Sequence, residues 1–203
     1  KNRYGIDIWS DDNFFIEDGV VKVNYKPYPS LIKIVKDVRK QGFKGPLLLR
    51  FPHITKKQVK TLFNTFNASI KEYDYKGKFN AVFPLKVNQL PNFIHPLVSY
   101  GKKYNYGLEA GSKAELIIAM TYNNMGSPIT INGFKDKEMI HLCFIAKSMG
   151  HDITVIIEGL NELEMILEVL KETKMEAPNV GLRVRLHRSE ERRVGKECLR
   201  LCR

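Results

Sequence analysis

Apolar and β-branched residues gather into short runs that recur at even spacing along the body of the chain. The runs lie near residues 80–85, 104–108, 129–132, 153–157 and 180–184. Between the runs, apolar residues return every three or four positions, as they do on one face of a helix. Two such sets are Leu116, Ile117, Ala119 and Met120, and Leu163, Ile166, Leu167 and Leu170. Strands that alternate with helices are typical of parallel βα units, so the pattern predicts an α/β fold.

Two architectures fit this pattern, a β/α barrel and an open doubly wound sheet. A Gly-x-Gly-x-x-Gly turn after a strand would favour the open sheet, and the sequence contains none. Five runs do not close a barrel of eight strands. If the chain folds as a barrel, it therefore forms only part of one.

The residues before the first run have a different pattern. Apolar stretches at 14–16 and 20–23 flank the pair Asp18-Gly19, which predicts a β-hairpin. Ser30 can cap a helix over residues 31–41. This segment is not expected to be part of a barrel.

A strand and a long helix are expected next. The apolar run at 47–51 follows Pro46 and predicts the strand. Thr55 and Gln58 have the spacing of a capping box, which predicts a helix that continues to about residue 73.

The charge invites a nucleic-acid hypothesis that its distribution disfavours. The 203 residues are 43% hydrophobic and carry a net charge of +11. Basic residues are scattered over predicted helix faces, as at Lys56, Lys57 and Lys60, and form no stripe with aromatic residues. We expect no nucleic-acid partner; binding that fell steeply with salt would argue otherwise.

Targeting signals and cysteines place few demands on the fold. No apolar run approaches the roughly 18 residues of a membrane span, and residues 1–12 lack the regions of a secretory signal. We expect a cytoplasmic protein without a membrane partner, although Lys1 in place of methionine indicates that the native start is missing. Only Cys143 lies in the body of the chain, so neither a disulfide framework nor a zinc site is expected.

A lysine near the middle of the chain is the main candidate for chemistry. Residues 83–89 read Phe-Pro-Leu-Lys-Val-Asn-Gln, which places Lys86 at the carboxyl end of a predicted strand. At that position in a β/α barrel, a partly desolvated amine can form an imine with an aldehyde cofactor. By spacing alone, a solvated strand end is the simpler interpretation. One βα unit later, residues 107–116 read Gly-Leu-Glu-Ala-Gly-Ser-Lys-Ala-Glu-Leu.

These two segments resemble the biosynthetic arginine decarboxylases, a family in the alanine racemase and ornithine decarboxylase-like group of pyridoxal-phosphate enzymes. The resemblance covers residues 4–187 and the amino-terminal portion of that family. Further landmarks in the same order are Tyr4-Gly5-Ile6-Asp7 with Trp9, Phe51-Pro52, Asn132-Gly133-Phe134-Lys135-Asp136, Ile157-Glu158 and Gly181-Leu182-Arg183-Val184-Arg185. The wider group shares the lysine, whereas the Lys-Val-Asn-Gln form points to this family.

The resemblance implies a function, a fold and cofactors. The reaction would be the pyridoxal-phosphate-dependent decarboxylation of L-arginine to agmatine and CO2, the first step of the agmatine route to putrescine and spermidine. The fold would be a partial (β/α)8 TIM-type barrel of the pyridoxal-phosphate-binding group. Pyridoxal 5'-phosphate and Mg2+ are the implied cofactors, and the full-length protein would be a homo-oligomer, a dimer or tetramer.

The resemblance also assigns site residues. Lys86 matches the lysine that carries the cofactor, and is the predicted catalytic residue. Glu109 matches an acidic position close to the cofactor and its lysine; capping of the following helix is the alternative role. Arg183 matches an arginine that faces the cofactor ring. Arg185 alternates to the same face and is the other candidate, and a structural ion pair is the alternative for either. No residue is assigned to a metal.

Other positions are expected to support this site. Glu115 lies on the helix after Glu109 and is expected either behind the site residues or exposed. The turn at 132–135 is expected to shape the site, with a simple helix start as the alternative role of its glycine. Glu158 ends the fourth run and is at best a supporting residue.

The resemblance divides the chain into three parts. Residues 1–45 form an amino-terminal segment of hairpin and helix, and residues 46–187 form an incomplete barrel of about five of eight strands. Residues 188–203 resemble the translated read-through of a sequencing adapter or vector, which we interpret as an artefact; a natural basic amphipathic tail is the alternative. A barrel without three strands exposes sheet edges and an apolar interior, so we expect this chain alone to be inactive.

Two other hypotheses remain. One is a decarboxylase of the same fold that acts on ornithine, lysine, diaminopimelate or carboxynorspermidine. The other is a non-catalytic barrel protein that binds pyridoxal phosphate. The long stretch before Lys86 argues against the second, because such proteins begin close to their barrel lysine.

Overall fold

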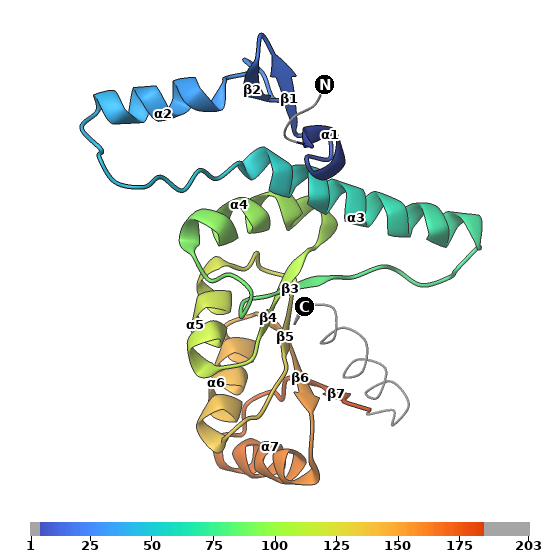
Figure 1. The fold of residues 1–203 in the computed structure, drawn as a ribbon. Coiled ribbons are helices and arrows are strands. Elements are labelled where there is room, and N and C mark those ends of the chain that lie inside the picture. The colour runs from blue at the N-terminus through green and yellow to red at the C-terminus, as the bar shows by residue number, and fades with distance from the viewer. Residues whose placement is uncertain (1–4, 185–203) are drawn as a thin grey trace, which may run out of the picture. The chain divides into compact units, whose positions relative to one another are not determined.

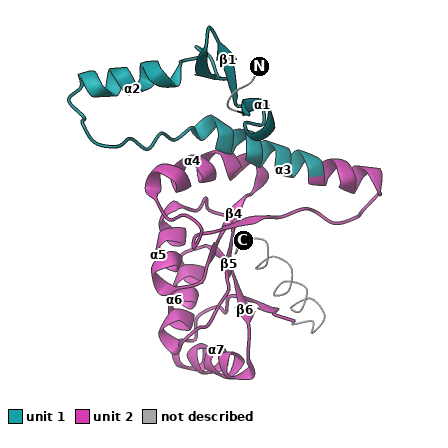
Figure 2. Ribbon diagram, in the orientation of Figure 1, with its two compact units in different colours: residues 1–65 teal, residues 66–203 magenta. Residues whose placement is uncertain are grey.

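The computed structural model describes residues 5–184. Its contacts divide the chain into two compact units, Lys1–Thr65 and Phe66–Arg203 (Figure 2). The division falls inside a long helix, α3 (Pro52–Glu72). The proposed domain boundaries at 45/46 and 187/188 stay predictions, and the tail at 188–203 lies outside the described residues.

The first unit contains the predicted hairpin and capped helix. Strands β1 (Phe14–Glu17) and β2 (Val20–Val23) pair antiparallel, and a short helix, α1 (Ile6–Trp9), precedes them. Asp18 and Gly19 have φ angles of 50° and 76°, the left-handed backbone of a tight hairpin turn. Helix α2 (Leu31–Lys40) follows, and the Ser30 hydroxyl accepts a hydrogen bond of 3.2 Å from the Lys33 N–H. The sequence therefore predicted both elements correctly.

The expected strand at 47–51 is absent, and the helix after it begins earlier than predicted. No described strand forms backbone pairing with residues 47–51, and the Leu48 side chain is 77% exposed. A strand needs a partner for its N–H and C=O groups, which an apolar run alone does not supply. Helix α3 begins at Pro52, because proline fixes φ for the first helical position and needs no N–H partner there. Thr55 lies within the helix.

The second unit is a parallel sheet with strands in sequential order. The order is β3-β4-β5-β6-β7, and each neighbouring pair is parallel. The strands are β3 (Val82–Pro84), β4 (Gly107–Ala110), β5 (Pro128–Ile131), β6 (Asp152–Ile157) and β7 (Asn179–Leu182). The predicted strand at 104–108 is shifted, because a 3-10 turn, η1 (Lys102–Tyr104), precedes β4.

Helices connect the strands along one side of this sheet. They are α4 (Pro91–Gly101), α5 (Lys113–Tyr122), α6 (Lys137–Ser148) and α7 (Leu160–Thr173). Figure 1 shows α5, α6 and α7 on the same side. A doubly wound sheet would reverse its strand order and have helices on both faces. Sequential order with helices on one side is the arrangement of a (β/α)8 barrel, so the prediction of a partial TIM-type barrel is confirmed.

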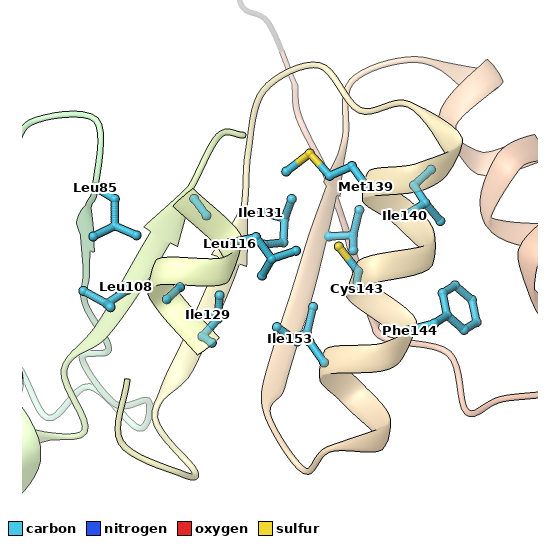
Figure 3. Close-up of a cluster of buried hydrophobic side chains, with 14 of the residues drawn as sticks. Leu85, Leu108, Leu116, Ile129, Ile131, Met139, Ile140, Cys143, Phe144 and Ile153 are labelled. Atoms are coloured by element: carbon cyan, nitrogen blue, oxygen red, sulfur yellow. The ribbon is translucent and has the colours of Figure 1, made fainter. Parts of the chain in front are cut away.

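Alternate residues of the strands build the core between sheet and helices. Ile129 and Ile131 of β5 and Ile153 and Val155 of β6 are buried, whereas the intervening Thr130 and its neighbours on the strands are partly exposed. Figure 3 shows these isoleucines against Leu116 of α5 and a group of side chains from α6. The α6 residues are Met139, Ile140, Cys143 and Phe144. Burial raises the pKa of the Cys143 thiol to about 12, consistent with a packing role.

The apolar set predicted for α7 marks the helix but not its buried face. Glu162, Ile166 and Val169 are the buried residues, whereas Leu163 and Leu167 are exposed. None of the helices between residues 5 and 184 has the length and apolar character needed to cross a bilayer.

Candidate active site

A cavity opens where the strands of the second unit end. Its volume is about 330 Å³. It is lined by Lys86, Glu109, Gly111, Glu115, Asn132, Gly133 and Arg183. These residues lie in or directly after β3, β4, β5 and β7, or at the start of the helix after β4. The carboxyl ends of parallel strands meet at one edge, which is where barrel enzymes place their catalytic residues.

Lys86 lies in the turn that directly follows β3. The Leu85 N–H donates to the Glu109 carbonyl over 2.9 Å, which continues the pairing of β3 and β4 by one residue. The Leu85 side chain is fully buried in the core, whereas Lys86 lines the cavity. Lys86 is exposed in this structure, which differs from the partly desolvated amine that the sequence led us to expect.

Glu109 lies in β4, opposite Pro84 in β3 and Thr130 in β5. It is half-buried and lines the cavity with Lys86. The alternative role, capping of the following helix, belongs to Ser112, whose hydroxyl accepts from the Glu115 N–H over 3.3 Å. Glu109 is thus placed with its predicted neighbour in the cavity.

Glu115 ties two cavity loops together. Its carboxylate accepts a hydrogen bond of 2.7 Å from the Gly111 N–H and one of 3.0 Å from the Gln89 side chain. The residue is 8% exposed, so of the two expectations for Glu115 the buried position is correct. Because Gln89 lies in the loop that begins with Lys86, this carboxylate holds the lysine turn against the loop after β4.

Two glycines let the loops after β4 and β5 approach each other. A Cβ atom on Gly111 would lie 3.3 Å from the Asn132 carbonyl oxygen. Gly133 has a φ of 95°, which residues with side chains rarely adopt, and a Cβ there would lie 3.4 Å from the Gly111 carbonyl oxygen. The turn at 132–135 therefore does shape the cavity wall, as its position in the sequence predicted.

Arg183 follows β7 and forms an ion pair at the edge of the cavity. Its Nη1 lies 3.0 Å from Oε1 of Glu158, and the same oxygen accepts from the Gly133 N–H over 2.8 Å. Arg183 is 43% exposed. Of the two roles expected for Arg183, the ion pair is present, and contact with a cofactor ring stays a prediction. Arg185 lies outside the described residues.

Comparisons with known proteins show which family the chain resembles as a whole. No protein-family model matches the chain. The chain is 35% identical over 201 residues to the biosynthetic arginine decarboxylase of Prochlorococcus marinus strain MIT 9515, covering 96% of this chain and 31% of the relative. It is 40% identical over 191 residues to that of Citrifermentans bemidjiense, with coverages of 90% and 30%. The crystal structure of the Campylobacter jejuni biosynthetic arginine decarboxylase matches with 60% identity and a TM-score of 0.88, covering 91% of this chain and 31% of that one.

The chain is a homologue of the biosynthetic arginine decarboxylases. It spans about 31% of the length of the first of these relatives. The described fold and cavity therefore correspond to only part of the length of these relatives. The family resemblance drawn from the motifs around Lys86 and Glu109 is confirmed; the roles of individual site residues stay predictions.

Sequence reasoning missed several residues that hold the loops of the cavity together. Gln89 contacts Glu115, and the pair Lys135 and Glu162 is buried. Gln89 belongs to the same motif as Lys86, so that motif could have pointed to Gln89. The sequence did not show that Glu162 lies on the buried face of α7, because the apolar residues next to it are Leu160 and Leu163.

Opposing effects act on the pKa of Glu158. Burial raises the pKa, whereas hydrogen bonds from Arg183 and the Gly133 N–H and the charges of Arg183 and Lys135 lower it. The lowering effects win, and the pKa lies below its ordinary value of 4.5. Because the folded-state pKa is the lower one, the carboxylate stabilises the fold above the unfolded-state value, and that stability is lost as pH falls through the folded-state pKa.

We expect Glu158→Gln to lower the thermal unfolding midpoint near neutral pH, and the difference from wild type to shrink at acid pH. Midpoints of both proteins measured from about pH 7 to about pH 3 test this, since protonation removes the charge that pairs with Arg183. Glu164→Gln, an exposed position on α7, is the matched control. A difference that stays constant over this pH range would show that charge pairing is not what Glu158 contributes.

Proposed function

We propose that this chain supplies the lysine-bearing part of a pyridoxal-phosphate-dependent decarboxylase that converts L-arginine to agmatine and CO2. One observation carries the proposal. In a chain 60% identical to a biosynthetic arginine decarboxylase of known structure, Lys86 lies in the turn after the first strand of the sheet and lines a cavity with Glu109 and Arg183. The product would feed putrescine and spermidine synthesis.

The side chains around the cavity fit the chemistry of pyridoxal phosphate. The cofactor presents an aldehyde, a ring and an anionic phosphate, and the cavity offers an amine at Lys86, a carboxylate at Glu109 and a guanidinium at Arg183. When bound, the cofactor supplies an electron sink for the electron pair that loss of CO2 leaves on the substrate. Of these cofactor groups, the predicted site residues match the aldehyde, through Lys86, and the ring, through Arg183.

We assign each of these residues a role in this proposal. Lys86 binds the cofactor through its side-chain nitrogen, which requires the neutral amine. Glu109 controls the protonation of that nitrogen from the neighbouring strand. Glu115 orients the lysine turn through Gln89. Arg183, ion-paired with Glu158, would contact the bound cofactor.

Three further features are proposed from the resemblance alone. These are Mg2+ as a second cofactor, a homo-oligomer as the assembled protein, and the cytoplasm as its location. Within residues 5–184, no group of three or more His, Cys, Asp or Glu side chains is arranged to hold a metal ion. The reaction steps assigned above to Lys86, Glu109 and Arg183 do not depend on any of these features.

The test is an assay of the protein encoded by the longest reading frame that contains this sequence. Supplied with pyridoxal phosphate, it is expected to release agmatine and CO2 from L-arginine, and much less product from ornithine or lysine. Release of putrescine from ornithine or cadaverine from lysine as the main reaction would reassign the substrate. Cofactor binding without release of CO2 from any basic amino acid would support the non-catalytic alternative instead.

A further inference from the structure

A fully buried ion pair joins the loop after β5 to helix α7. Lys135, in the loop after β5, is 0% exposed, and Glu162, in the first turn of α7, is 1% exposed. Their Nζ and Oε2 atoms are 3.1 Å apart. A buried ion pair is weak as a source of stability, because desolvation of both charges opposes their attraction. The presence of this pair is better explained if it fixes one arrangement of the surrounding loops.

Glu162 accepts hydrogen bonds from two different loops. Its Oε1 accepts from the Lys135 N–H over 3.2 Å, and its Oε2 accepts from the Glu158 N–H over 2.8 Å. The first donor belongs to the loop after β5 and the second to the loop after β6. One carboxylate therefore links two loops, of which the loop after β5 lines the cavity through Asn132 and Gly133.

Lys135 extends this network to the cavity wall. Its ammonium group also donates to the Gly133 carbonyl, while the Gly133 N–H donates to the Glu158 carboxylate. The same carboxylate oxygen holds Arg183. Gly133 is thus held at both of its polar backbone groups, and Arg183 is anchored to a residue whose own backbone is held by Glu162.

We propose that Lys135 and Glu162 are positioning residues for Arg183 and Gly133. The pair sets where the guanidinium stands at the cavity, without lining the cavity itself. The proposal rests on the proposed function, because it takes pyridoxal phosphate as the molecule that Arg183 binds. We expect loss of the pair to weaken cofactor binding because Arg183 is displaced. We do not expect the protein to unfold.

A double-mutant cycle on the full-length protein separates these two routes. The dissociation constant for pyridoxal phosphate is measured from the absorbance of the bound cofactor for wild type, Lys135→Met, Arg183→Gln and the double variant. Each single change is expected to weaken binding about tenfold, the order of one charge-assisted contact. The double variant should be no weaker than Arg183→Gln alone, since coupled residues are not additive.

Three further variants test the interpretation. Lys137→Met removes the same charge from a neighbouring surface lysine that pairs with Glu168 and Glu172, and is expected to leave cofactor affinity unchanged. Should Lys135→Met fail to fold because Glu162 is left unpaired, Lys135→Met combined with Glu162→Leu removes both buried charges and is expected to fold and bind weakly. Lys135→Arg should restore part of the affinity.

The outcomes also distinguish this inference from the proposed function. Wild-type protein that binds no pyridoxal phosphate overturns both. Wild-type protein that binds it, with losses from Lys135→Met and Arg183→Gln that multiply in the double variant, overturns only the positioning role. The positioning role is also overturned if Lys135→Met combined with Glu162→Leu folds and binds the cofactor as tightly as wild type.

Discussion

Lys86→Ala should reduce arginine decarboxylation by the full-length protein by about a thousandfold or more, because it removes the amine that attaches the cofactor. Removal of an exposed turn residue should leave folding intact, so circular dichroism and the unfolding midpoint are expected to match wild type. Activity is measured as agmatine and CO2 release. Borohydride reduction followed by digestion should place a pyridoxyl adduct on the Lys86 peptide of wild type alone.

Lys78→Ala is the matched control for this experiment. Lys78 is an exposed lysine upstream of β3 and does not line the cavity. Its loss should leave both activity and the adduct in place. An adduct on another lysine, or full turnover by Lys86→Ala, would remove the basis for the catalytic assignment even if the protein proved to be a decarboxylase.

Gly107→Ala should be the most destabilising small substitution in the sheet. A Cβ at Gly107 would overlap the Pro128 carbonyl oxygen and lie 2.8 Å from its carbon. Both atoms are backbone of the neighbouring region of β5, and Gly107 is itself held by a 2.9 Å hydrogen bond from its N–H to the Ala81 carbonyl. Neither strand can yield without loss of pairing, so we expect a cost of about 3 kcal/mol in the free energy of unfolding.

Gly45→Ala provides the control with the same chemical change. Nothing lies within 4 Å of a Cβ at Gly45, and its φ is outside the left-handed region. That substitution should change stability by no more than about 0.5 kcal/mol. Denaturant unfolding of both variants in the full-length protein measures the difference. Equal stabilities would mean that β4 and β5 are not as close at Gly107 as the structure has them.

Local patterns predicted most of the regular elements because their causes are local. The turn at Asp18-Gly19 needs two left-handed residues, and Ser30 needs only the N–H groups of the helix that follows it. The five runs of the parallel sheet were found for a similar reason, since strands buried by covering helices are apolar. The start of β4 differs from the prediction because a 3-10 turn precedes it, and α3 starts earlier than predicted because Pro52 begins the helix.

Errors arose where an element depends on a distant partner. The apolar run at 47–51 has the composition of a strand, but pairing needs another edge, and no described residue provides one. In α7 the spacing of leucines showed the helix, yet the buried face carries Glu162 because Lys135 neutralises it from another loop. A charged residue on the inside of a helix cannot be inferred from hydrophobicity.

The sequence by itself determined the α/β class, because periodicity is a property of neighbouring residues. Its resemblance to a known family pointed to Lys86, Glu109 and Arg183 as candidates. Only the tertiary structure decided which side chains meet. Glu115 reaches Gln89, and Glu162 joins two loops to Arg183, because parallel strands bring their carboxyl ends to one edge whatever their separation along the chain. Those contacts form between segments that carry no signal of one another.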